Sequence, residues 1–243
     1  IALALLLSAP AAYAADWNST NVQLLYGTDY ADIGGIDDKK KTVFTFEHAD
    51  GWKYGDNFFF LDTSNPNARG TAHYAEFSPR LSLSALTGKA LAFGPIKDTL
   101  IAGTWEQGDG VRAYLLGVGF ALKLPKFAFA DINIYARQSM RDFSPVDTDT
   151  GMQVTLDWLL PFDVIGLKFA FEGFFDYAWG EDGGSVPIEE NIVSGPRLLI
   201  DVGNFVGAPG KLQAGVEWQI WRNKFGINGV DEDVPQAMLK WTL

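Results

Sequence analysis

Apolar and polar side chains alternate along most of this chain. The stretch IGLKFAFEGFFDYAW, residues 165–179, shows the pattern clearly. If it forms a strand, Lys168, Glu172 and Asp176 share one side, and most of the aromatic residues share the other. These three charges are also four residues apart, which suits one stripe of a helix. The segment alone leaves both structures open, so the rest of the chain must decide.

Alternating segments of the same kind recur from one end of the chain to the other, separated by residues that favour turns. The sequence predicts twelve strands, over residues 20–26, 41–48, 53–61, 71–84, 98–106, 111–122, 127–138, 152–160, 164–179, 193–202, 211–222 and 237–243. Most exceed about 5–6 residues, the usual strand length in soluble proteins. They approach or exceed the length of about 9–11 residues that a tilted strand needs to cross a bilayer. An all-β fold follows.

The connections between these segments alternate in length. The tight turns are predicted at residues 49–52, 124–126 and 161–163, and the long loops at 27–40, 141–151, 180–191 and 223–235. A medium connection at 65–70 fits the alternation, whereas a medium link at 87–97 and a short one at 107–110 interrupt it. Outer-membrane barrels have an even number of strands, short periplasmic turns and longer outer loops. The connections therefore favour a twelve-stranded antiparallel transmembrane β-barrel with its N-terminus on the periplasmic side.

The barrel interpretation also decides which side of each strand faces inward. A soluble β-sandwich gives the same alternation, with its polar face in water. In a membrane barrel, a Lys side chain turned toward the middle of the bilayer costs about 2–4 kcal/mol, and Asp or Glu somewhat less. We therefore predict that Lys168, Glu172 and Asp176 face the lumen, and that the opposite row of aromatic residues faces lipid and its interfaces.

The first residues indicate export. Residues 1–14, IALALLLSAPAAYA, form a short apolar run that ends in Ala12-Tyr13-Ala14, a form typical of a signal-peptidase site. We predict a truncated signal peptide over residues 1–14, cleaved on export to the bacterial outer membrane, and a single β-barrel domain over 15–243. A buried N-terminal helix is the alternative. The run is too short to anchor a membrane-spanning helix.

Composition narrows the function further. The formal net charge is −11, so nucleic acid is not an expected partner, because phosphate binding needs clustered Lys and Arg. The 26 glycines disfavour a helical protein. The absence of Cys excludes disulfides, thiolate metal sites and Cys nucleophiles.

Residues 76–98, EFSPRLSLSALTGKALAFGPIKD, resemble the hallmark of the Tsx/OmpK family of outer-membrane porins. The stretches DGWKYGDNFFFLD (50–62) and LDWLLPFDVIGLKFAFEGFFDYAWG (156–180) resemble the same family. The resemblance implies a monomeric twelve-stranded barrel. One branch of the family forms nucleoside-selective channels lined by aromatic and ionisable residues, and another is known mainly as surface receptors for bacteriophage. The SPRLSLSALTGK block is nearer the second branch, and no motif carries over individual nucleoside-contacting residues.

The strand alternation predicts a lumen lining that can stack a flat base and bind ribose hydroxyls. Stacking on an aromatic ring is worth about 1–3 kcal/mol per base. The predicted inward set is Tyr74, Glu76, Arg80, Asp131, Tyr135, Arg137, Asp157, Lys168, Glu172, Phe174, Asp176, Arg197, Asp201 and Glu217. We expect Asp176 to lie near Arg197, and Lys168 toward Asp201. Arg80 has two interpretations, a lumen residue or an anchor for the turn at 87–97.

Two functions remain open at this point. The first is a channel for passive diffusion of small polar solutes, nucleosides being the favoured class, with membrane lipid as the other partner. The alternative is a surface receptor or contact barrel, for example for bacteriophage attachment, whose lumen is closed by ion pairs. We expect no enzyme, cofactor or metal. The two histidines, His48 and His73, lie in no metal-ligand spacing, and no serine motif accompanies them.

Overall fold

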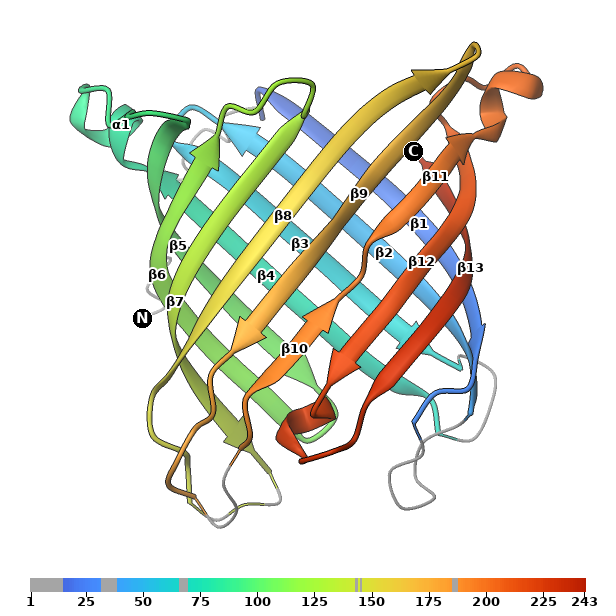
Figure 1. Ribbon diagram of the computed structural model, residues 1–243. Coiled ribbons are helices and arrows are strands. Elements are labelled where there is room, and N and C mark those ends of the chain that lie inside the picture. Colours follow the sequence, from blue (N-terminus) through green and yellow to red (C-terminus); the bar gives the residue numbers. More distant parts are fainter. Residues whose placement is uncertain (1–14, 32–38, 66–69, 143, 145, 185–187) are drawn as a thin grey trace, which may run out of the picture.

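The computed structural model describes residues 15–31, 39–65, 70–142, 144, 146–184 and 188–243, and its strands close into a barrel (Figure 1). The predicted signal peptide lies outside the described residues. The strands are β1 (Trp17–Thr28), β2 (Lys40–Trp52), β3 (Gly55–Ser64), β4 (Ala72–Ser82), β5 (Ile96–Gly108), β6 (Val111–Leu122), β7 (Phe129–Arg141), β8 (Gly151–Val164), β9 (Leu167–Ala178), β10 (Asn191–Ser194), β11 (Arg197–Asp201), β12 (Leu212–Arg222) and β13 (Glu232–Thr242). One short α-helix, α1 (Leu83–Thr87), and two 3-10 turns, η1 (Val202–Phe205) and η2 (Lys224–Gly226), join them.

The barrel has twelve strand positions, which confirms the predicted fold. Apart from β10 and β11, each strand pairs antiparallel with its neighbour in sequence, and β1 pairs with β13 to close the sheet. Both β10 and β11 lie between β9 and β12. They are the two halves of one position, interrupted at Gly195 and Pro196. Proline has no N–H to donate to a neighbouring strand, which explains why the predicted strand 193–202 is split.

Two predicted turns are displaced in the structure. The turn expected at 49–52 lies at Lys53 and Tyr54, because Gly51 still pairs with Asp56. The turn expected at 161–163 lies at 165–166, where Ile165 (φ 51°) and Gly166 (φ 79°) are both left-handed. A two-residue hairpin turn of this kind matches strand twist. Ile165 therefore belongs to the turn and not to the lipid-facing row.

The two faces of the wall differ in composition. Outward positions carry exposed apolar residues such as Leu24, Leu116 and Leu198, whereas buried polar residues such as Gln23 and Glu217 point inward. Outward aromatic residues gather near both rims: Tyr26, Trp105, Tyr114 and Trp218 near one, Phe162, Phe169 and Trp241 near the other. Membrane barrels place aromatic girdles at the two interfaces.

In the part of the chain that the structure describes, no helix is both long and apolar enough to cross a membrane.

Candidate functional site

The strand register places all the predicted lumen residues on one face of the sheet, the face that carries the buried polar side chains. Ion pairs between strands that are not neighbours identify this face as the interior. Arg197 on β11 reaches Glu47 on β2 at 3.6 Å, across the positions of β12, β13 and β1. Arg80 on β4 likewise reaches Asp131 on β7 at 3.1 Å.

Arg197 is the centre of the first network. Its guanidinium donates to Glu217 at 2.5 Å and lies 3.6 Å from Glu172 as well as from Glu47. Lys240 donates to Glu172 at 2.7 Å, so the same carboxylate serves two cations. All these side chains are largely buried. Two cations and three carboxylates therefore converge across the lumen.

The partner predicted for Arg197 was wrong, because the register differs from the expected one. Arg197 lies opposite Glu172 on β9, whereas Asp176 lies opposite Val193 on β10. Lys168 and Asp201 do line one cavity of about 330 Å³ at the mouth that holds the short turns. Asp201 also caps η1, since it accepts from the backbone N–H groups of Asn204 (3.2 Å) and Gly210 (2.8 Å).

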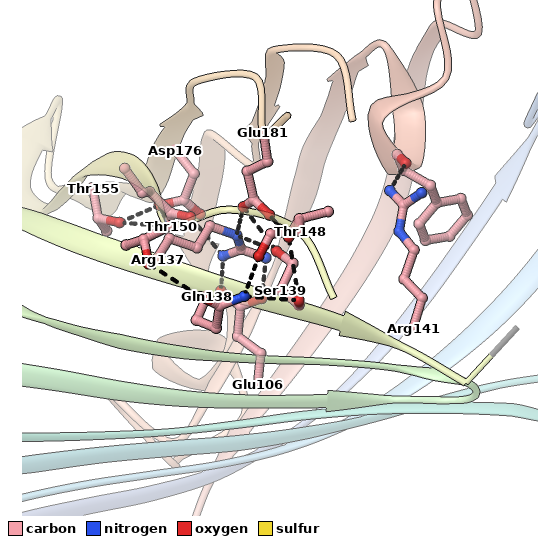
Figure 2. Close-up of polar contacts among 12 residues, drawn as sticks. Glu106, Arg137, Gln138, Ser139, Arg141, Thr148, Thr150, Thr155, Asp176 and Glu181 are labelled. Atoms are coloured by element: carbon pink, nitrogen blue, oxygen red, sulfur yellow. Dashed lines mark hydrogen bonds and ion pairs between the residues drawn. The ribbon is translucent and has the colours of Figure 1, made fainter. Parts of the chain in front are cut away.

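Arg137 is the centre of a second network, near the opposite mouth (Figure 2). It donates to both carboxylate oxygens of Glu106, at 2.5 and 2.7 Å, and to Gln153 at 2.7 Å. Glu181, from the loop after β9, lies 3.6 Å from Arg137 and accepts from Ser139 at 2.9 Å. A loop residue is thereby fixed to the barrel wall.

Arg80 is the centre of a third network. This side chain donates to both oxygens of Asp56, at 2.7 and 3.0 Å, and to Asp131. Its partners come from β3 and β7, so Arg80 is a lumen residue that links two parts of the wall and does not anchor the turn at 87–97. Both Arg80 and Asp131 are mostly buried.

Three long connections meet at the second mouth. The guanidinium of Arg141 donates to the carbonyl oxygen of Phe225 at 2.7 Å (Figure 2). The Asn223 amide donates to the carbonyl of Glu190 at 2.9 Å, and the Glu189 N–H donates to the carbonyl of Gly226 at 3.0 Å. The end of β7 and the links after β9 and β12 are thus tied together by hydrogen bonds.

Sequence reasoning missed part of the aromatic lining. The register of β3 turns Phe58 and Phe60 inward, together with Tyr74 on β4. The rings of Phe60 and Tyr74 are 5.8 Å apart, and those of Phe58 and Phe60 are 5.9 Å apart. The Tyr74 hydroxyl donates to Glu76 at 2.7 Å. The run Phe58-Phe59-Phe60 has no polar residue to reveal its alternation, but the neighbouring Asp56 and Asp62 share the parity of the two inward rings.

Carboxylates outnumber cations on the inner wall. Away from the rims, the inward acids that the structure describes are Glu47, Asp62, Glu76, Glu106, Asp131, Asp157, Glu172, Asp176 and Glu217, and the inward bases are Arg80, Arg137, Arg197 and Lys240. Asp157 contacts Asn133 at 3.4 Å, and Asp176 accepts from Thr155 at 2.5 Å and Gln153 at 3.2 Å. Within the described residues neither forms an ion pair with Lys or Arg.

The remaining predicted residues complete the wall between these networks. Tyr135 is buried, and Thr104 lies 3.5 Å from its hydroxyl. Phe174 lies opposite Asp157 and against Gly195, where an added Cβ would come within 2.8 Å of the ring. Polar acceptors, donors and aromatic faces therefore line the interior of the barrel.

The sequence is similar to a family of channel proteins of known name and to individual outer-membrane proteins. The sequence model of the family described as "Nucleoside-specific channel-forming protein, Tsx" matches residues 14–189. The outer membrane protein OmpK of Vibrio parahaemolyticus is 28% identical over 120 residues, which are 44% of this chain and 42% of OmpK. The nucleoside-specific channel-forming protein Tsx of Salmonella typhimurium is 26% identical over 127 residues, 49% of this chain and 44% of Tsx. The matched part thus spans less than half the length of these relatives.

A solved structure shares the architecture. The KdgM porin in complex with disordered oligogalacturonate superposes with a TM-score of 0.50 over 92% of this chain and 99% of its own, at 8% sequence identity. At this identity the likeness supports the fold alone.

Proposed function

Because the chain belongs to the family of nucleoside-specific channel-forming proteins, Tsx, we propose that it is an outer-membrane channel for passive diffusion of small polar solutes, with nucleosides as the favoured class. The observation that carries the proposal is the inner wall, which combines the rings of Phe58, Phe60 and Tyr74 with hydrogen-bonding carboxylates. Aromatic faces suit a base, and carboxylates accept hydrogen bonds from ribose hydroxyls. The family is one of channels, in agreement with the expectation that the chain is not an enzyme.

Each chain is proposed to act as a monomer, because one chain closes its own sheet through the β1–β13 pairing. Flux would follow the solute gradient, since conduction needs only weak binding along the path. Bacteriophage attachment to the long loops is the alternative function, with the lumen closed by its ion pairs.

Single-channel recording in planar bilayers distinguishes the two functions. We expect ion conductance that nucleosides reduce, and that equal concentrations of sugars or amino acids reduce less. Liposome swelling with the same solutes gives an independent measure of flux. A barrel that is folded and inserted but electrically silent would contradict the channel and favour a contact role.

The aromatic wall gives the first variant test. Replacing Phe60 with leucine removes a ring that is placed to stack on a base, a contact worth about 1–3 kcal/mol. We expect the nucleoside concentration that halves the current to rise by roughly fivefold or more. Phe59→Leu is the matched control, because Phe59 points outward and packs against Phe46 at 6.3 Å. Equal effects of the two substitutions would contradict a role for the inner ring.

The excess of inward carboxylates gives a second test. We expect the channel to prefer cations over anions, because fixed charges of one sign in a narrow low-dielectric path favour counter-ions. The zero-current potential under a KCl gradient reports this preference. The double substitution Asp157→Asn, Asp176→Asn should move that potential toward zero, whereas Asp147→Asn in the exposed loop after β7 should leave it unchanged. Anion preference in the unmodified protein would refute the prediction.

A further inference from the structure

Residues 83–95, between β4 and β5, form a strap at the rim that carries the short turns. The strap projects to the side of the barrel, away from the axis (Figure 1). It begins with α1, whose N-cap Ser82 accepts from the Ala85 N–H at 3.0 Å, and α1 ends at Gly88 in the left-handed region (φ 67°). The strap returns to β5 through a bridge between Phe93 and Ile96.

The strap is held in a defined shape by its own hydrogen bonds. The Thr87 hydroxyl donates to the Leu83 carbonyl at 2.6 Å, and the Leu91 N–H donates to the Ser84 hydroxyl at 2.9 Å. Thr99, on the outward side of β5, donates to the Leu91 carbonyl at 3.1 Å. These hydrogen bonds therefore hold the backbone of the strap, and with it the positions of the side chains that the strap exposes.

Those side chains are largely apolar. Leu86 is 51% exposed, Leu91 38% and Phe93 62%. The Phe93 ring packs edge-on against Phe120, an outward residue of β6, with centroids 6.5 Å apart. The apolar surface of the strap is thus continuous with the lipid-facing wall of the barrel. Exposed apolar side chains that adjoin one another on a folded surface are a feature of sites that contact a partner or lipid.

Four lysines lie on the strap, at the start of β5 and in the turn after β6. Lys89, Lys97, Lys123 and Lys126 are all exposed, and the Lys123 N–H donates to the carbonyl of Pro95 at 2.7 Å, which joins the strap to the next turn. In the described part of the chain none of these four ammonium groups has a carboxylate partner. Such a cluster is unexpected in a chain of net charge −11.

We propose that the strap is an interfacial anchor that inserts Leu86, Leu91 and Phe93 into the phospholipid leaflet on the periplasmic side, while the four lysines bind the phosphate groups of anionic lipid headgroups. Apolar side chains beside lysines are the combination by which surface elements bind anionic membranes. The proposal rests on the proposed outer-membrane channel, since it takes the rim with the short turns to be periplasmic.

Single-cysteine labelling tests the insertion, because these 243 residues include no Cys. A nitroxide on Phe93→Cys, in protein folded into phospholipid vesicles, should be more accessible to oxygen than to a water-soluble nickel complex. Leu116→Cys, mid-barrel and outward, is the hydrocarbon control, and Val146→Cys, in the loop after β7, is the aqueous control. If position 93 behaves like position 146 while position 116 is in lipid, the anchor is wrong. If position 116 is also in water, the membrane barrel and the proposed function fail with it.

Lipid selectivity tests the lysines. Native mass spectrometry should detect more phosphatidylglycerol than phosphatidylcholine bound to the unmodified protein. The preference should fall by about fivefold for each lysine replaced by glutamine. The matched control is Lys53→Gln, at the turn between β2 and β3. An unchanged preference in the Lys89, Lys97, Lys123, Lys126 variant would overturn the proposal, as would displacement of the lipid by inorganic phosphate at equal phosphate concentration.

Discussion

Replacing Arg197 with methionine is expected to destabilise the barrel by about 3–5 kcal/mol, the usual cost of removing one partner from a buried ionic network. Arg197 faces Glu47, Glu172 and Glu217 from a position where its own side chain is 15% exposed. Without the guanidinium, three carboxylates share one part of the lumen with Lys240 as the nearest cation, bound to Glu172 at 2.7 Å. Their mutual repulsion sets the size of the effect, because all three carboxylates are largely buried.

Reversible urea unfolding in phospholipid vesicles measures this loss. Lys168→Met is the matched control, because Lys168 is an exposed inward cation at the rim that forms no ion pair within the described residues. Its removal should change the free energy of unfolding by less than about 1 kcal/mol.

A second substitution separates charge from packing. Adding Glu217→Gln to Arg197→Met removes one of the orphaned carboxylates and should recover part of the lost stability, since the double-mutant cycle measures the coupling of the pair. Additive losses in the double variant would mean that Arg197 stabilises the barrel through its volume and not through its charge.

The sequence was sufficient for the architecture because membrane strands obey two strong rules. Lipid disfavours charge on the outer face, which fixed the inward direction of Lys168, Glu172 and Asp176. The alternating segments predicted twelve strands, and the alternation of loop lengths favoured a membrane barrel over a soluble sandwich. The first rule applies to each strand separately, whereas the second compares the connections along the whole chain.

The register could not be predicted in the same way. Whether Glu172 or Asp176 lies opposite Arg197 depends on how many residues the connection after β9 uses, and both alternatives keep every side chain on its correct face. Similarly, the apolar side chain of Ile165 suits the predicted strand 164–179, but its left-handed backbone places it in the turn before β9. The inward direction of Phe58 and Phe60 could not be predicted from the run Phe58-Phe59-Phe60, because three consecutive aromatic residues show no alternation of apolar and polar side chains.

The second large effect is expected on the outer face of the barrel, where Leu116→Arg should lower the free energy of unfolding. Leu116 lies near the middle of β6, points outward and is 67% exposed, so that lipid is its expected surrounding. Arg at the bilayer midplane of a barrel costs about 2–4 kcal/mol, whereas the same change near an interface costs about 0–1 kcal/mol. Leu122→Arg, on the same outward face at the end of β6, is therefore the matched control.

Comparing the two variants by urea unfolding distinguishes a bilayer from water around the barrel. A hydrocarbon slab penalises Arg at position 116 much more than at position 122, because an arginine near the rim extends its guanidinium to the headgroups. A soluble barrel would accept both substitutions with similar small losses, since each side chain would already be in water. Equal effects in vesicles would therefore contradict the membrane orientation on which the inward direction of the charged residues depends.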